Sequence, residues 1–182
     1  KDGRIHADNT NGYGFIANIR QIAPDWQAKT GPALVLGAGG ASRAVISALL
    51  DEGAPEVILA NRTRIRADML GEHFGARVRV IDWTQINSEI SNSATLVNTT
   101  SLGMRGQPEL RIELKNVNPG TLVTDIVYSP LQTDLLKTAA AKDCITVDGL
   151  GMLLHQAVPG FETWFRKKPQ VDDALRAAVL AT

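Results

Sequence analysis

Cysteine and histidine are scarce in this sequence. Its single cysteine, Cys144, excludes an intrachain disulfide and is typical of a reducing compartment, which favours the cytoplasm. Cys144 begins the apolar stretch CITVDG, so we expect a buried structural thiol there. The three histidines, His6, His73 and His155, lie far apart without the spacing of metal ligands, so we expect no metal site.

The sequence also lacks an excess of either charge and any long apolar run. Its 19 Lys and Arg residues balance 19 Asp and Glu residues, which argues against nucleic acid as a partner. No segment has the ~20 apolar residues that cross a bilayer, and no signal peptide is visible, so we expect no membrane partner. The 182 residues, 44% of them apolar, are enough for one domain with a core. Because the chain begins with Lys1, we interpret it as a piece of a longer protein.

Short apolar segments alternate with amphipathic ones along most of the chain. We predict strands at 33–36 and 57–60 and within the stretches ARVRVIDW, ATLVNTTSLGM, GTLVTDIVYSP (broken by Pro130) and CITVDG. Helices are predicted between them, and GMLLHQAVPGFETWF is expected to bend or break near Pro159. The irregular segment 103–120 is predicted to be a surface loop. This order predicts an α/β fold, a Rossmann-like doubly wound parallel sheet of about six strands with helices on both faces.

Ligands of such folds bind beyond the carboxyl ends of the strands, and the first strand is followed by GAGGAS. Gly37 and Gly39 meet the first two positions of the G-x-G-x-x-G pattern, and Ser42 takes the third, after Gly40 and Ala41. Small residues between a strand and a helix let the backbone approach a pyrophosphate at the helix N-terminus. The pattern predicts a dinucleotide site, although a tight turn without a ligand would give the same spacing.

The end of the second strand indicates which dinucleotide is bound. NAD sites usually place a carboxylate there for the ribose 2′-hydroxyl, and this sequence has none. Arginine can bind a 2′-phosphate through charge-assisted hydrogen bonds, so the sequence favours NADP. Arg64 is interpreted as a solvated helix residue. The expected contacts are Asn61, Arg62, Thr63 and Arg66, with Arg62 foremost.

Six motifs resemble the C-terminal part of the shikimate dehydrogenase family. They are DNTNGYGF, VLGAGGASRA, ANRTRIRA, LVNTTSLGM, TDIVYSP and DGLGMLLHQA, in the family's order and over nearly the whole chain. The resemblance implies that residues 1–182 form an NADP-binding domain whose N-terminal partner, the substrate domain with the catalytic lysine, is absent. Residues 1–24 would be a linking strand, catalytic loop and helix, and residues 168–182 a helix packing toward the absent domain. The apolar stripe of that last helix could drive self-association.

The resemblance also implies roles for individual residues. Without it, Met104 and Met152 would be interpreted as core or loop residues, and Gln156 as part of a solvated helix face. Asn98, Thr99 and Ser101 would form the loop beside the nicotinamide ribose, with Met104 near the ring. Gly149 and Met152 would lie on the ring's other side, and Tyr128 and Gln156 against the substrate.

The family's reaction implies a hydride transfer between NADPH and the 3-position of the substrate ring, which interconverts 3-dehydroshikimate and shikimate in aromatic amino acid biosynthesis. A lysine and an aspartate act at the reacting oxygen, and Asn11 stands where the family has that aspartate. Asparagine cannot move a proton, so four interpretations stay open. They are a disabled variant that still binds substrate, catalysis carried by the lysine, a non-catalytic NADP(H)-binding module, and an aspartate wrongly assigned as asparagine. Thr10 or Asn11 could also cap the following helix. Quinate dehydrogenase is the nearest rival within the family.

Overall fold

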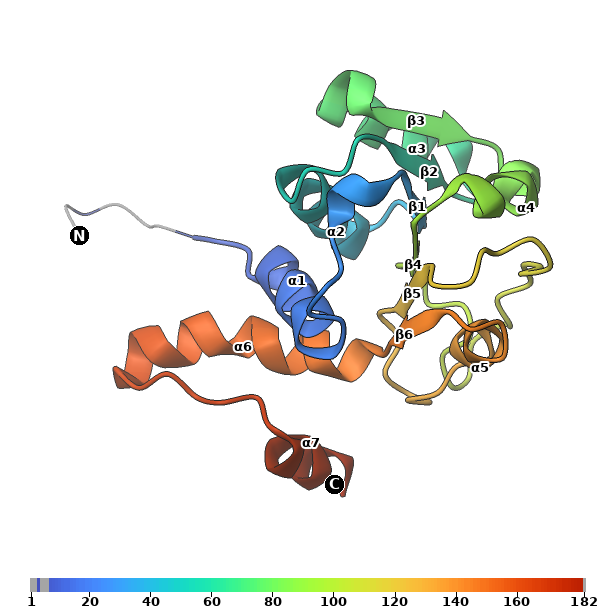
Figure 1. Ribbon diagram of the computed structural model, residues 1–182. Helices are drawn as coiled ribbons and strands as arrows, with labels where there is room; N and C mark the ends of the chain where they lie inside the picture. Colours follow the sequence, from blue (N-terminus) through green and yellow to red (C-terminus); the bar gives the residue numbers. More distant parts are fainter. Residues whose placement is uncertain (1–2, 4–6, 182) are drawn as a thin grey trace.

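The computed structural model describes residue 3 and residues 7–181, so His6 and most of the expected linking strand lie outside it. Six parallel strands form one sheet in the order β3-β2-β1-β4-β5-β6 (Figure 1). Their bounds are β1 (Ala33–Leu36), β2 (Val57–Ala60), β3 (Val78–Ile81), β4 (Thr95–Asn98), β5 (Leu122–Asp125) and β6 (Ile145–Val147). This order, with β1 and β4 side by side at the centre, is that of a doubly wound Rossmann-like sheet, and the predicted fold class is confirmed.

Helices cover both faces of the sheet. The α-helices of the described residues are α1 (Asn11–Ile22), α2 (Gly40–Asp51), α3 (Arg64–Phe74), α4 (Ile86–Glu89), α5 (Asp134–Ala140), α6 (Gly149–Phe165) and α7 (Asp173–Leu180). Apolar residues of α1, α2, α3 and α6 form the core on one face, and those of α4 and α5 form it on the other. No helix in this part of the chain has the length and hydrophobicity to cross a bilayer.

The segment 103–120 is more than the surface loop that the sequence predicted. It has no helix or strand, yet its Leu114 and Val117 are buried in the core on the α5 face. The connection between β4 and β5 lacks a long helix, so the apolar side chains of the loop itself cover this part of the sheet. The mixed polar composition of the segment hid this role.

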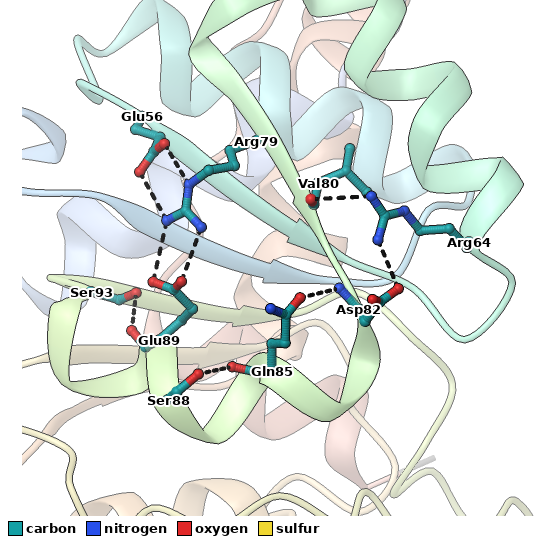
Figure 2. A network of polar contacts seen from close by, with 9 residues as sticks. All are labelled: Glu56, Arg64, Arg79, Val80, Asp82, Gln85, Ser88, Glu89 and Ser93. Carbon is teal, nitrogen blue, oxygen red and sulfur yellow. Dashed lines mark hydrogen bonds and ion pairs between the residues drawn. The ribbon is translucent and has the colours of Figure 1, made fainter.

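The four strands of the sheet centre are buried along their whole length, which explains the continuous apolar sequences of β1 and β2, whereas β4 and β5 also bury polar residues at their ends. The edge strand β3 is less buried: Val78 and Ile81 at its two ends are buried, and Arg79 between them is exposed. Arg79 forms ion pairs of 2.9 Å with Glu89 and with Glu56 (Figure 2), and these hydrogen bonds raise the pKa of its guanidinium. A charged, paired side chain on an edge strand discourages pairing with another sheet.

Three local predictions differ from the structure. Helix α6 does not break at Pro159 but continues to Phe165; the proline removes only the hydrogen bond to the carbonyl of His155, a partly exposed residue. Strand β5 ends at Asp125, well before Pro130, because the Val127 N–H donates to the Asp125 side chain instead of to a neighbouring strand. Cys144 precedes the edge strand β6 and is only partly buried, although that burial raises the pKa of its thiol.

Candidate active site

The turn after β1 brings its first glycine against the loop after β4. Gly37 has a φ of 108°, which side-chain-bearing residues rarely adopt, and a Cβ there would lie 2.7 Å from the Thr99 hydroxyl oxygen. Glycine at position 37 is therefore required by the fold itself, whether or not a ligand binds.

The next two glycines are not required by the fold. A Cβ placed on Gly39 or Gly40 would have no atom of the described chain within 4 Å, and both residues are exposed. Helix α2 begins at Gly40, so its first N–H groups face this open space, where they would bind an anion. The space that a Cβ would fill, beside a helix N-terminus, fits a pyrophosphate that the backbone approaches closely.

Ser42, at the third position of the glycine pattern, connects this turn to the loop after β4. Its hydroxyl accepts from the Gly39 N–H at 3.0 Å and lies 2.6 Å from the Thr99 hydroxyl. The Thr99 hydroxyl donates to the Leu36 carbonyl at 2.6 Å, so its single proton is used and Ser42 must be the donor to Thr99. The sequence analysis missed this role of Ser42, because the pattern expects only a small residue there.

Arg62, Arg64 and Arg66, which follow β2, are of two kinds. Arg64 donates to Asp82 at 2.7 Å and to Asp68 at 2.9 Å, and Figure 2 shows it held beside β3. The exposed side chains of Arg62 and Arg66 form no hydrogen bond or ion pair with any described residue. Two unpaired cations therefore stand at the end of β2.

Asn61 holds the β2 end against the glycine turn. Its amide oxygen accepts from the Ala38 N–H at 3.2 Å, and its amide nitrogen donates to the Thr63 carbonyl at 2.8 Å. Asn61 therefore fixes the distance between the open space at Gly39 and the free arginines.

The ends of β4, β5 and β6 bring together the residues expected around the nicotinamide. The turn that carries Ser101 and Met104 is joined to the loop of Tyr128 by the Arg105 N–H, which donates to the Ser129 carbonyl at 2.8 Å. A Cβ on Gly149 would overlap the Ile126 carbonyl, so α6 starts directly against the β5 loop.

Their exposure differs from residue to residue. Ser101 and Tyr128 are exposed, and Met104 is partly buried. Met152 is only 7% exposed and belongs to the core, so most of its surface serves packing.

The stretch NTNGYG starts α1 and lies between two other helices. A Cβ on Gly14 would lie 2.6 Å from the Met152 carbonyl oxygen, and one on Gly12 would lie 3.2 Å from the Ala44 carbonyl oxygen. These glycines let α1 pack closely on α6 and α2, which brings Asn11 near the turn of α6 that carries Gln156.

The capping interpretation of this stretch holds for the position of Thr10 but not for its side chain. Thr10 occupies the N-cap position without a side-chain hydrogen bond, and the Asn11 N–H donates to the Asn9 side chain at 2.9 Å. The part-exposed Asn11 side chain has no partner among the described residues.

The comparisons with known proteins agree with this geometry. The family model of shikimate / quinate 5-dehydrogenase matches residues 18–126, which include the glycine turn and the ends of β2, β4 and β5. The chain belongs to the shikimate/quinate dehydrogenase family. A shikimate dehydrogenase (NADP(+)) of Roseobacter denitrificans is 63% identical over 180 residues, which are 99% of this chain and 65% of that relative.

Solved structures of the family have the same fold. The quinate dehydrogenase of Corynebacterium glutamicum in complex with NAD gives a TM-score of 0.87 at 29% identity, covering 96% of this chain and 63% of that one. The shikimate 5-dehydrogenase of Thermus thermophilus in complex with NADP(H) and shikimate gives 0.79 at 35% identity, covering 93% and 61%. The chain therefore spans about 65% of the length of the curated relatives that it matches.

Two aspartates of this family member were not singled out by the sequence analysis. Asp125, at the end of β5, is buried and accepts three hydrogen bonds. Asp148 caps α6 by accepting from the Leu150 N–H at 3.0 Å, and it pairs with Arg176 of α7 at 2.7 Å. An aspartate just before a helical pattern is a cap signal that could have revealed Asp148, whereas no pattern in the sequence marks Asp125.

Proposed function

We propose that the chain is the cofactor-binding part of an NADP-dependent shikimate dehydrogenase, which reversibly reduces 3-dehydroshikimate to shikimate in aromatic amino acid biosynthesis. The observation that carries this proposal is the pair of unpaired arginines, Arg62 and Arg66, at the end of β2, which Asn61 bonds to the turn with the open space at Gly39 and Gly40. Two cations without a carboxylate partner favour the 2′-phosphate of NADP over the 2′-hydroxyl of NAD. The names of the Roseobacter relative and of the Thermus structure, which holds NADP(H) and shikimate, support the same assignment.

Each group of residues has a distinct task in this proposal. The cofactor, when bound, supplies or accepts the hydride at its nicotinamide ring. The α2 N-terminus at Gly40 and Ala41 would hold the pyrophosphate, and Arg62 and Arg66 the 2′-phosphate. The ring side would consist of Thr99, Ser101, Met104, Gly149 and Met152, with Tyr128 and Gln156 toward the substrate.

Asn11 decides how much chemistry the protein performs. An amide can hold a substrate hydroxyl by hydrogen bonds, but it cannot take up or release the proton that accompanies the hydride. We therefore propose that Asn11 positions the substrate and that turnover is weaker than with an aspartate. A non-catalytic NADP(H)-binding module is the alternative from another class, and the lack of a titratable group at position 11 favours it.

The remaining third of the relatives' length would supply the substrate domain. On this proposal the 182-residue chain alone binds NADP(H) and turns over little or no shikimate. The single cysteine and the NADP(H) chemistry favour the cytoplasm. The expected self-association through α7 also remains a proposal, for which the exposed Leu180 is the supporting observation. Sedimentation at several concentrations tests it, and a monomer throughout would count against it.

Cofactor titration tests the proposal directly. The chain should bind NADPH at least ~10-fold more tightly than NADH, and Arg62→Gln should remove most of that difference, since a hydrogen bond to a charged group contributes ~1.5–3 kcal/mol. Arg111→Gln is the matched control, because Arg111 is exposed on the 103–120 segment. Its one ion pair among the described residues is a long one, with 3.7 Å between its Nε and Oε2 of Glu109. Equal affinity for NADH and NADPH in the unmodified chain would overturn the choice of cofactor.

A further inference from the structure

Asp125 is a buried carboxyl group at the carboxyl edge of the sheet, between the ends of β4 and β6. It is 1% exposed, and no Lys, Arg or His of the described residues pairs with it. Loss of contact with water raises the pKa of Asp125 to about 6, although its hydrogen bonds act in the opposite direction. A buried acid without a cation is costly, so its place in the fold calls for an explanation.

The three donors to Asp125 come from three different segments. The Asn98 amide nitrogen donates to Oδ1 at 2.9 Å, and the Val127 N–H donates to the same oxygen at 3.0 Å. The Thr133 hydroxyl donates to Oδ2 at 2.8 Å from the N-cap of α5. Both oxygens of an ionised carboxylate are acceptors, so it can accept from all three donors. An amide in its place would turn its NH₂ group toward one of them.

Through Asn98, Asp125 sets the turn that carries Ser101 and Met104. The same Asn98 nitrogen also donates to the Leu102 carbonyl at 3.2 Å, while its oxygen accepts from the Thr100 N–H at 3.1 Å and the Thr100 hydroxyl at 2.7 Å. The carboxylate accepts only from the nitrogen side of the amide, so it fixes which way the amide faces. If the amide turned over, all of these bonds would be lost together.

On its other side, Asp125 sets the loop that carries Tyr128. Val127 adjoins Tyr128 directly, and Thr133 closes the loop where α5 begins. The two loops are also joined to each other through Arg105 and Ser129. Asp125 is therefore bonded both to the loop that carries Met104, expected beside the nicotinamide ring, and to the loop that carries Tyr128, expected beside the substrate.

We propose that Asp125 is a positioning residue that holds residues 98–104 and 126–129 in the arrangement that receives the nicotinamide half of the cofactor. The proposal rests on the proposed function, because it assumes that these loops receive NADP(H). The adenosine half of the site, at Asn61 and Arg62, forms no direct hydrogen bond with Asp125 or Asn98, so it should depend on Asp125 much less than the nicotinamide half does.

Binding of two probes to the 182-residue chain tests the proposal. Asp125→Ala should weaken NADPH binding about 10-fold or more, in keeping with the loss of a charged hydrogen-bonding partner. The same variant should change the affinity for 2′,5′-ADP, which has only the adenosine half, by less than ~2-fold. Asp125→Asn should lose less, because the Thr133 hydroxyl can turn and accept from the new amide. The exposed neighbour Asp134 gives the control, and Asp134→Ala should leave both affinities unchanged.

Hydrogen exchange without ligand separates this proposal from the proposed function. Amides of residues 98–104 and 126–129 should exchange faster in Asp125→Ala, while those of β1 and β2 keep their protection. If NADPH and 2′,5′-ADP weaken equally, or if the loops keep their protection, Asp125 does not position them and the proposal is wrong.

If the unmodified chain binds neither probe, the proposed function fails, and the exchange data alone decide whether Asp125 holds the loops. Should Asp125→Ala not fold, Asp125→Asn takes its place and must show the same selective loss in smaller measure, with NADPH weakened and 2′,5′-ADP unchanged.

Discussion

The two halves of the candidate site are built in opposite ways. At the ends of β1 and β2, the residues expected to touch the cofactor are exposed and make no side-chain contacts that the fold needs: Gly39, Gly40, Arg62 and Arg66. At the ends of β4, β5 and β6, buried polar groups 27 residues apart in sequence, such as Asn98 and Asp125, hold one another in place. The first half is an exposed surface whose residues are available to a ligand, whereas the second half is a buried hydrogen-bond network that fixes the shape of its own loops. Substitutions should therefore affect binding alone in the first half, and binding together with stability in the second.

The largest expected effect concerns position 11, on the ring side. In a polypeptide that joins this chain to the part of its relatives that it does not cover, Asn11→Asp should raise the rate of shikimate oxidation by ~10²- to 10⁴-fold. This is the contribution of a positioned acid–base group. NADP⁺ reduction by shikimate measures it, and NADPH affinity should stay unchanged. If both forms turn over alike, a group other than residue 11 carries the proton. If neither form turns over while NADPH binds, the chain is a binding module.

Alanine substitutions of two glycines, Gly14 and Gly40, compare the two halves directly. Gly14→Ala should destabilise the fold by about 3 kcal/mol or more, because its Cβ would meet the Met152 backbone at 2.6 Å. Gly40→Ala should change stability by less than ~0.5 kcal/mol and yet weaken NADPH binding about tenfold, since its Cβ enters the open space before α2. Urea unfolding and NADPH titration measure the two effects. Equal stability losses in both variants would contradict the difference between the halves.

The same contrast explains what the sequence could predict. Strands 33–36 and 57–60 and the glycine turn follow from local patterns, since buried parallel strands have continuous apolar sequences and the turn needs small residues. Arg62 and Arg66 were also accessible to prediction, because a missing carboxylate at the end of β2 is a local signal. The sequence also left Arg64 out of the expected contacts, but as a solvated helix residue; its ion pair with Asp82, after the next strand, could not be predicted from local patterns.

The ring side could not be assembled from the sequence in this way. The roles of Met104, Met152 and Gln156 were expected only through the family resemblance, and they remain predictions. Asp125 and Ser42 act through partners 27 and 57 residues away, and no periodicity records such distances. The segment 103–120 had too mixed a composition to reveal that Leu114 and Val117 are buried. Tertiary contacts, and not local propensity, decide these features.

Asp125 should also give the protein a distinctive dependence of stability on pH. A folded pKa of about 6 lies above the ordinary value of ~4 in the unfolded chain, so the folded state binds more protons between these values. Stability should therefore fall as pH rises from 4 through 6, by an amount on the order of 3 kcal/mol at most, and then level off.

The groups that face Asp125 are Asn98, Val127 and Thr133, none of which titrates in this range. Urea unfolding across this range checks the pH dependence. Asp125→Asn should show a flatter profile, and an identical slope in both proteins would rule out Asp125 as its source.

The smallest effect separates the two kinds of arginine on the open side. Arg64→Gln removes two exposed ion pairs, which contribute little in water, so the melting temperature should fall by only ~1–3 °C. NADPH affinity should change by less than ~3-fold, because Arg64 is bonded to Asp68 and Asp82 and not to the cofactor. Losing these exposed pairs should itself have little effect, since exposed ion pairs are weak. Arg62→Gln should do the reverse, with no change in melting temperature and a marked loss of NADPH affinity. If Arg64→Gln weakened NADPH binding as much as Arg62→Gln, the ion pairs would have to open when the cofactor binds, and the open half of the site would not be preformed.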